Sequence, residues 1–257
     1  MPAVSTVIVV PCYNEEKRLD TGAFLALAEQ GDLRVLFVDD GSADGTRPMI
    51  ERAASAAPSR LGVIALDRNR GKAEAVRRGL VAGLEAGAGI VGYIDADGAT
   101  PPLEMLRLRA ALDAWPADAV LGSRLRLLGR EVTRRPARHY LGRVMATIVS
   151  QIVLEMPVYD TQCGAKVFRR SPALEAALAT PFVTSWVFDV ELIGRMVFGL
   201  GDAPPWPMGA MIEEPLLRWT DVPGSKIGPG AGLRALVDLF RLAYIFRRAR
   251  RRFGRLS

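Results

Sequence analysis

Cysteine and histidine are scarce in this chain, and each shortage argues against a class of protein. The 257 residues include two cysteines, Cys12 and Cys163, which lie far apart and form no Cys-x-x-Cys pair. Neither a disulfide framework nor a zinc ribbon is therefore indicated, and a reducing cytoplasm fits best. The single histidine, His139, lies among arginines that would depress its pKa, and we favour a surface or membrane-facing role for it over catalysis.

Long uninterrupted apolar segments are also missing. The longest are broken by polar residues such as Gln151 and Asp238, well short of the roughly 20 residues that span a bilayer. No signal peptide is visible, and we expect no transmembrane helix. Aromatic residues make up 7% of the chain, few for the stacking platforms that bind nucleic acid, so we expect no nucleic-acid partner.

Hydrophobic residues are abundant, at 49% of the chain, enough for the core of an α/β domain. The net charge of +6 is uneven: residues 226–257 hold nine Lys and Arg against Asp238 alone, a net +8 that leaves residues 1–225 at −2. A second basic cluster contains Arg124, Arg126, Arg130, Arg134, Arg135, Arg138 and Arg143. An anionic membrane surface or a phosphorylated substrate explains two such patches better than nucleic acid does.

Strand and helix patterns alternate through the first hundred residues. Runs rich in β-branched residues predict four strands, at 4–10, 33–38, 61–66 and 90–94. Apolar periodicity predicts three helices between them, at about 16–30, 45–57 and 72–87. This order implies a Rossmann-like, mostly parallel sheet flanked by helices, whose ligands bind beyond the C-terminal ends of the strands.

The pattern is less regular after residue 100. Expected there are a helix near 102–114, a strand at 119–121, an amphipathic stretch at 140–155, a strand at 166–168, a helix at about 187–199 and a strand at 214–219. No segment is rich enough in linker residues to separate domains, so we predict a single domain.

Polar residues follow each predicted strand of the first half. Asp95-Ala96-Asp97 directly follows the fourth strand; its carboxylates can hold Mg²⁺ or Mn²⁺ against a diphosphate, or can serve as loop caps. Asn69-Arg70-Gly71-Lys72 opens a helix whose free amides favour anions. The first two strand ends carry Pro11-Cys12-Tyr13-Asn14-Glu15-Glu16 and Asp39-Asp40-Gly41-Ser42, with a tyrosine that can stack on a base and acids that can accept hydrogen bonds from a base or ribose. Each motif alone is also a common turn or N-cap; their succession is specific.

These motifs together resemble the family 2 glycosyltransferases, inverting enzymes with the nucleotide-sugar-binding A-type fold. Within that family the chain looks most like polyprenyl-phosphate sugar transferases of the dolichyl-phosphate β-glucosyltransferase kind. Further matching motifs are Gly122-Ser123-Arg124, Asp160-Thr161-Gln162-Cys163-Gly164 with Lys166, Trp186-Val187-Phe188-Asp189-Val190-Glu191 and Gly224-Ser225-Lys226. The resemblance covers roughly residues 4–228. It departs at the N-terminus, where those relatives carry a membrane anchor, and at Ala73 and Glu74, where they usually carry glycines.

The resemblance implies roles for individual residues. The nucleotide would be held by Pro11, Tyr13, Glu15, Asp39, Asp40, Lys72, Asp95 and Ala96. Asp97 would ligate the divalent ion directly, and Asp95 would act on the ribose or through a metal-bound water. Ala99 stands where mannosyl relatives have a glutamine ligand, so water or Thr100 would replace it. Ser225 and Lys226 would close over the diphosphate. The acceptor would be bound by Arg124, Arg134, Arg135, Arg138, Gln162 and Lys166, and catalysis would depend on Asp97, Arg124, Asp189 and Lys226.

The implied reaction transfers a hexose, glucose from UDP-glucose in the first place, to a polyprenyl phosphate. A phosphate monoester has a second pKa of about 6, so its oxygen is already anionic and needs cationic clamping rather than a base. A hydroxyl acceptor on a glycan or natural product would need a base, and Asp189 lies about where inverting relatives keep one. An N-cap or acceptor-orienting role for Asp189 is equally compatible. Two further hypotheses are a GDP-mannose donor and a non-catalytic nucleotide-sugar-binding membrane protein.

We divide the chain into a glycosyltransferase domain at 1–228, with a nucleotide-binding half at 1–100 and an acceptor half at 101–228, and a basic amphipathic helix and tail at 229–257. That helix can lie in a membrane interface with its arginines near anionic headgroups, or it can pack on the protein or on a second copy. The expected location is the cytoplasmic face of a membrane, with peripheral attachment.

Overall fold

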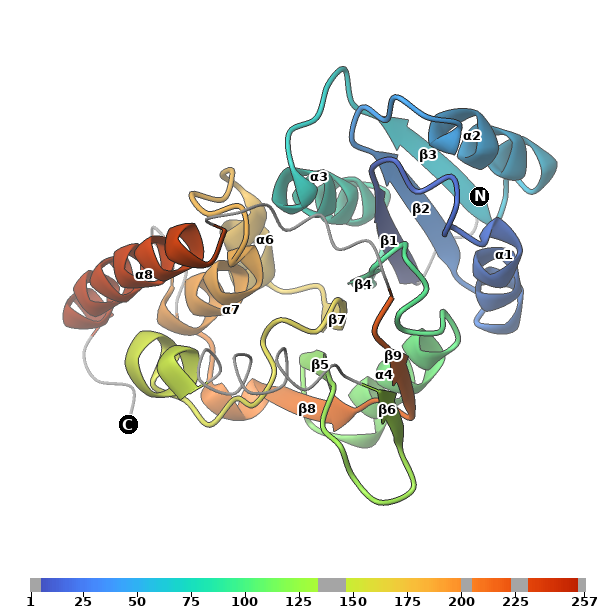
Figure 1. Ribbon diagram of the computed structural model, residues 1–257. Helices are drawn as coiled ribbons and strands as arrows, with labels where there is room; N and C mark the ends of the chain where they lie inside the picture. Colours follow the sequence, from blue (N-terminus) through green and yellow to red (C-terminus); the bar gives the residue numbers. More distant parts are fainter. Residues whose placement is uncertain (1–5, 134–146, 200–204, 223–230, 254–257) are drawn as a thin grey trace.

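A seven-stranded sheet of order β3-β2-β1-β4-β7-β5-β8 forms the centre of the computed structural model, which describes residues 6–133, 147–199, 205–222 and 231–253 (Figure 1). The strands are β1 (Thr6–Cys12), β2 (Arg34–Asp39), β3 (Leu61–Ala65), β4 (Ile90–Ile94), β5 (Ala119–Ser123), β7 (Ala165–Arg169) and β8 (Met211–Pro215). β7 runs antiparallel to its neighbours β4 and β5, and the other strand pairs are parallel. The predicted mostly parallel α/β sheet is confirmed.

Helices cover both faces of this sheet. They are α1 (Thr21–Gln30), α2 (Thr46–Ala56), α3 (Lys72–Glu85), α4 (Glu104–Ala114), α6 (Pro172–Leu178), α7 (Phe188–Phe198) and α8 (Ala231–Phe253). One apolar core lies between the sheet and α1, α2 and α4, and the other between the sheet and α3, α6, α7 and α8. Because both faces are covered, β4 is buried along its whole length, as its uninterrupted apolar sequence predicts.

Local sequence explains how individual helices are set against the sheet. Gly79 lets α3 approach β1 closely, since a Cβ at this position would lie 2.3 Å from Cγ1 of Val9. Ser171 caps α6 by accepting a hydrogen bond from the N–H of Leu174 at 3.2 Å, and Pro172 follows in the first turn, where its missing N–H costs nothing. The sequence interpretation missed α6, whose seven residues are too few for a clear period.

The second half corrects the prediction of one strand at 214–219. β8 ends at Pro215, and β9 (Arg218–Thr220) instead pairs with β6 (Glu131–Thr133) in a separate two-stranded sheet. Between them Leu216 is fully buried, and the N–H of Leu217 donates to the Glu104 carboxylate at 3.1 Å. The chain therefore passes from the central sheet to the two-stranded sheet between Pro215 and Arg218. The alternation of apolar and polar residues does not indicate such a change. A short 3₁₀ turn, Met208–Ala210, precedes β8, and the described end of the stretch predicted at 140–155 is a π-helical turn, Val149–Leu154.

The C-terminal helix shares the core of α7. The ring of Phe246 on α8 lies 5.1 Å from that of Phe198, and a Cβ on Gly194 would lie 2.1 Å from the Phe246 ring. Within the ranges that the structure covers, every helix is too short or too polar to span a membrane. The predicted division after residue 228 falls at 223–230, outside the described residues, and stays a prediction.

Candidate active site

The loops that follow β1 and β2 are bonded to each other. Asn14, which adopts a left-handed conformation at φ 51°, accepts a hydrogen bond from the N–H of Ala43 at 2.8 Å and donates its own N–H to Ser42 Oγ at 3.0 Å. The N–H of Glu15 donates to Thr46 Oγ1 at 2.7 Å. These bonds join the first two polar strand ends into one rigid edge of the sheet, where parallel α/β folds bind ligands.

Four of the predicted nucleotide contacts lie at this edge, with different exposure. Pro11 and Tyr13 are half-buried. The Glu15 carboxylate is nearly buried and accepts two hydrogen bonds from the guanidinium of Arg18, at 2.8 and 2.6 Å. Asp39 is fully buried and accepts the backbone N–H three residues further on, at 3.3 Å. The structure brings these residues together, and their contacts with a nucleoside stay predictions.

Asp40 holds the loop in front of α3. Its carboxylate is 2% exposed and accepts the N–H groups of Arg70 at 2.7 Å and Gly71 at 2.8 Å. Burial raises the pKa of Asp40, although these two hydrogen bonds act to lower it. In this structure Asp40 therefore positions the loop that leads into α3, whose first residue is Lys72. The direct nucleotide contact expected of Asp40 stays a prediction.

Asp95 and Asp97 follow β4 and lie beside the ammonium of Lys72. Lys72 Nζ is 2.5 Å from Asp95 Oδ1. Burial raises the pKa of the Asp97 carboxyl, and the charge of Asp95 raises it further. Desolvation acts to lower the pKa of Lys72, but the charges of Asp95 and Asp189 outweigh it and the pKa is raised. The sequence interpretation missed Arg18. Its positive charge acts to lower the pKa of Asp97 and so opposes the effect of Asp95.

This carboxylate pair fits a hard divalent cation. Two carboxylates that repel each other in a half-buried site are both stabilised in their ionised form by a cation between them. Across the described ranges, no cluster of three or more His, Cys, Asp or Glu side chains could hold a metal by itself. The other ligands would then come from a bound diphosphate and water. Ala99, at the position of the missing glutamine, donates its N–H to Asp97 Oδ1 at 3.1 Å and so orients that carboxylate.

Because Gly164 has no side chain, the Asp95 carboxylate fits against its backbone. A Cβ at this position would lie 2.1 Å from Asp95 Oδ2, and the Gly164 carbonyl accepts the N–H of Asp95 at 3.0 Å. This glycine belongs to a motif that the sequence displays, but nothing in that motif indicates contact with a carboxylate that follows another strand. The pairing of β7 with β4 creates the contact.

Asp189 lies in the first turn of α7 within a buried polar group. Its Oδ1 is 2.6 Å from Lys166 Nζ and also accepts a hydrogen bond from the hydroxyl of Tyr93. Asp189 is 4% exposed, and Lys166 and Tyr93 are fully buried. Burial raises the pKa of Tyr93 well above its ordinary value, and the charge of Asp189 raises it further, so the phenol remains a hydrogen-bond donor.

The ion pair bears on two predicted roles. The ammonium of Lys166 contacts Asp189 and the Cys163 carbonyl, the latter at 2.5 Å. The acceptor contact expected of Lys166 stays a prediction. A general base needs an oxygen that can reach the substrate and accept its proton. One oxygen of Asp189 is already held by two donors, which favours the orienting role over the basic one.

Arg124 follows β5 and forms a two-point ion pair with Asp160. Its Nε and Nη2 atoms each lie 2.7 Å from one carboxylate oxygen, and its guanidinium lies 5.5 Å from the ring centroid of Trp219. Burial acts to lower the pKa of Arg124, but the Asp160 charge outweighs it and raises the pKa. Gln162, from the same motif as Asp160, has a buried Nε2 with no hydrogen-bond partner among the described residues. The unused Nε2 donor suits an anionic acceptor, whereas Asp160 already balances the charge of Arg124. The acceptor contacts of both residues stay predictions.

The remaining predicted residues differ in what the structure says of them. Ala96 is buried in the core beneath the sheet edge. Outside the described residues lie Arg134, Arg135, Arg138, His139, Ser225 and Lys226.

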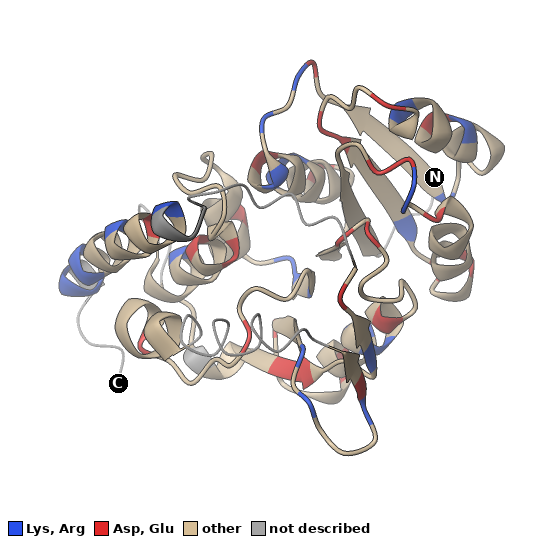
Figure 2. Cartoon of the chain, viewed as in Figure 1, with Lys and Arg blue, Asp and Glu red and all other residues tan. Residues whose placement is uncertain are grey.

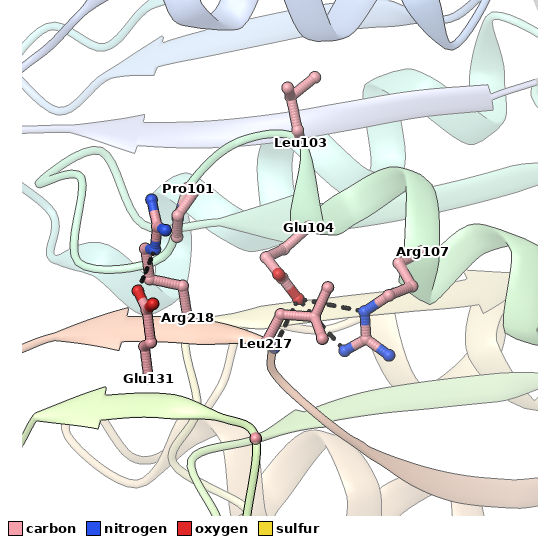
Figure 3. A pocket seen from close by; sticks show the side chains of 8 residues that line it. Pro101, Leu103, Glu104, Arg107, Glu131, Leu217 and Arg218 are labelled. Carbon is pink, nitrogen blue, oxygen red and sulfur yellow. Dashed lines mark hydrogen bonds and ion pairs between the residues drawn. The ribbon is translucent and has the colours of Figure 1, made fainter.

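A pocket of about 390 Å³ lies between the start of α4, the loop after β5, and the strands β6 and β9 (Figure 3). Its charged side chains pair with each other: Arg107 contacts Glu104, and Arg218 contacts Glu131 at 2.8 Å. Of the predicted site residues that the structure describes, none lines it. Because its charges are already matched, we assign it no ligand.

Comparisons with known proteins give three results. Residues 7–175 match the family model "Glycosyl transferase family 2". Dolichyl-phosphate beta-glucosyltransferase from Homo sapiens is 31% identical over 89% of this chain and 71% of its own length, and polyprenol monophosphomannose synthase from Mycolicibacterium smegmatis is 30% identical over 76% and 73%. Glucosyl-3-phosphoglycerate synthase from Mycobacterium tuberculosis shares the fold: its complex with phosphoglyceric acid has a TM-score of 0.65 at 19% identity, over 94% of this chain and 80% of its own. Its complex with Mn²⁺, UDP and glucosyl-3-phosphoglycerate has a TM-score of 0.57 at 18% identity, over 98% and 82%.

Proposed function

The chain belongs to glycosyl transferase family 2, and from this membership we propose that it transfers a hexose, glucose in the first place, from UDP-glucose to a polyprenyl phosphate with inversion at the sugar. The relatives support the acceptor, because the human enzyme carries dolichyl phosphate in its name and the mycobacterial one a polyprenol phosphate. The carboxylates at the C-terminal end of β4 support the donor, since that edge is where such sheets bind nucleotides.

The observation that carries the choice of nucleophile is the buried contact of Asp189 with Lys166 and Tyr93. Two donors hold Oδ1 of this carboxylate in place, which supports an orienting role over proton transfer. An acceptor phosphate oxygen is anionic near neutral pH and forms its bond to the sugar carbon without giving up a proton. The sugar leaves its diphosphate in the same step, so negative charge grows on the leaving group.

Some residues of the chain would then stabilise the leaving group, and others would bind the nucleophile. Asp95 and Asp97 would hold a divalent ion, Mg²⁺ or Mn²⁺, which supplies charge stabilisation to the diphosphate when bound. A related fold that was solved with Mn²⁺ and UDP supports this assignment. Lys72 would add positive charge on the same side, and Arg124 would orient the acceptor phosphate.

Two competing reactions differ from this proposal, one in the donor and one in the acceptor. The similarity to a monophosphomannose synthase favours GDP-mannose as the second donor. A hydroxyl acceptor with Asp189 as base would have to give its proton to Oδ2, because Lys166 and Tyr93 both contact Oδ1. We place the enzyme at the cytoplasmic face of a membrane, attached peripherally, because a polyprenyl chain is held in lipid.

The proposal is tested by incubating the chain with polyprenyl phosphate, Mn²⁺ and a panel of radiolabelled nucleotide sugars. We expect label from UDP-glucose to enter the lipid fraction. Asp97→Asn should lower the rate roughly a hundredfold or more, because it weakens the grip on the leaving group. The matched control is Glu29→Gln, an exposed carboxylate on α1 that should have no effect. Label from GDP-mannose alone would make the chain a mannosyltransferase, and no label from any donor would refute the proposal.

A further inference from the structure

The face of α8 that points away from the core has an apolar centre. Val237, Phe240 and Tyr244 recur at helical spacing and are 59%, 64% and 63% exposed. The opposite face of the helix, including Leu239 and Leu242, is buried against α7 and the π-helical turn. The sequence left open whether this helix packs on protein or lies on a membrane; in the structure one face packs and the other remains uncovered.

Arginines flank the exposed apolar centre on both sides. They are Arg234, Arg241, Arg247, Arg248 and Arg251, all exposed. At 100° per residue, each lies within about 80° of Val237 around the helix axis. The guanidinium of Arg248 lies 5.9 Å from the centroid of the Tyr244 ring. Asp238 is the only acid in the sequence between 231 and 253, and Figure 2 shows the basic residues along α8.

We propose that this outer face of α8, made of Val237, Phe240, Tyr244 and the flanking arginines, lies on the surface of an anionic lipid bilayer. Large apolar side chains along the middle of a helix enter the boundary between headgroups and acyl chains, and arginines beside them reach anionic headgroups. Long arginine side chains can extend to the headgroups while their stems stay in the apolar layer.

The charge pattern favours this occupant over two others. A second copy packed through the same face would bring two sets of arginines together, with little acid to compensate. A nucleic acid would match the charge but would leave the Val237 side chain in contact with phosphates or water. The inference deepens the proposed function, since it brings the chain to a membrane that holds a lipid acceptor, but the surface is argued from α8 alone.

Sedimentation with vesicles tests the surface without donor or acceptor. The full chain is mixed with vesicles of phosphatidylcholine alone or with phosphatidylglycerol added. We expect binding to the anionic vesicles, weakened by salt, and little binding to the neutral ones. The variant Phe240→Ser/Tyr244→Ser should bind the anionic vesicles roughly tenfold more weakly, because it removes exposed apolar area from the contact.

The matched control is Trp115→Ser. Trp115 is 60% exposed, similar to Phe240, but it caps α4, which packs on the other face of the sheet. It should leave vesicle binding unchanged, and circular dichroism should show that all variants fold. Full binding by the Phe240→Ser/Tyr244→Ser variant, or no binding by the wild type, would overturn the proposal. A dimer in sedimentation velocity that is lost in this variant, without vesicle binding, would assign the face to a second copy.

A transfer assay in detergent with a short-chain lipid phosphate separates this inference from the proposed function. The α8 variant should retain its rate there, because the substrate no longer has to be reached in a bilayer. A failed membrane contact with intact transfer, or the reverse, would therefore identify which of the two proposals is wrong.

Discussion

Asp95 is constrained from three directions, and this determines what it can do. Lys72 contacts one carboxylate oxygen, Gly164 leaves room for the other, and Asp97 adds a second negative charge close by. Contacts on two sides restrict the orientation of this side chain, which is what a site for a diphosphate-bound cation requires. Substitutions at this residue and its neighbours should therefore change the affinity for a divalent cation.

Gly164→Ala should weaken Mn²⁺ binding in the presence of UDP, because the new methyl group would displace the Asp95 carboxylate. Losses of roughly 10- to 100-fold are typical when the support of a metal ligand is removed, and we expect an effect of that size. Titration calorimetry measures it. Gly129→Ala is the matched control: it lies where a Cβ meets nothing within 4 Å, although its φ of 79° adds some strain. Unchanged Mn²⁺ affinity in Gly164→Ala would mean that Asp95 does not serve the ion.

The affinity for Mn²⁺ should also depend on pH through Asp97. Its pKa is raised above 3.8 by burial and by Asp95, so its proton competes with the ion at a higher pH than for an ordinary carboxyl. Affinity should rise as the pH increases through this pKa and then level off. Electron paramagnetic resonance of free Mn²⁺ between about pH 4 and 7 measures the change. A flat profile would contradict the assignment of Asp97 as a ligand.

A substitution of Asp189 can distinguish a role in orienting the acceptor from a role as a general base. Asp189→Asn leaves the buried ammonium of Lys166 unpaired and should lower the free energy of unfolding by about 3 kcal/mol. The pH profile of kcat should keep its shape, because no proton passes through this side chain. The double variant Asp189→Asn/Lys166→Met should recover stability by removing the unpaired charge. If either variant lost one limb of the pH profile of kcat, Asp189 would have to be assigned as a general base.

At the scale of elements, α7 connects the candidate site to the core. Every residue of this helix is buried, including Glu191 and Arg195, whose side chains pair at 2.6 Å. Glu191 also accepts hydrogen bonds from the backbone of Val183 and Thr184, so the pair secures the loop between α6 and α7. That loop leads into the turn that presents Asp189.

Glu191→Ala should therefore cost about 3 kcal/mol of unfolding free energy, since it leaves a buried guanidinium without its carboxylate. The matched control is Glu51→Ala on α2, where Arg47 and Glu51 form a pair of the same spacing at 2.9 Å but half exposed. That change should cost less than about 0.5 kcal/mol. Urea denaturation compares the two. Equal losses would show that burial of the α7 pair does not matter.

At the scale of the whole molecule, alternation of strands and helices was enough to predict the first four strands and the polar edge they share. It could not predict the placement of β7, because a pattern along the chain does not say which strands pair. β7 lies between β4 and β5, and this placement brings Gly164 to Asp95 and Lys166 to Tyr93. The roles of Gly164 and Asp40 escaped prediction for the same reason, since each depends on a contact between distant segments.

We infer that an anionic phosphate, and not a hydroxyl, attacks the sugar. The most direct measurement compares transfer from UDP-glucose to polyprenyl phosphate with transfer to the matching polyprenol, under identical Mn²⁺ and detergent. We expect label in the phosphate alone, since Asp189 is held by Lys166 and Tyr93 and is poorly placed to take the alcohol's proton. Transfer to the alcohol at an equal rate would contradict it.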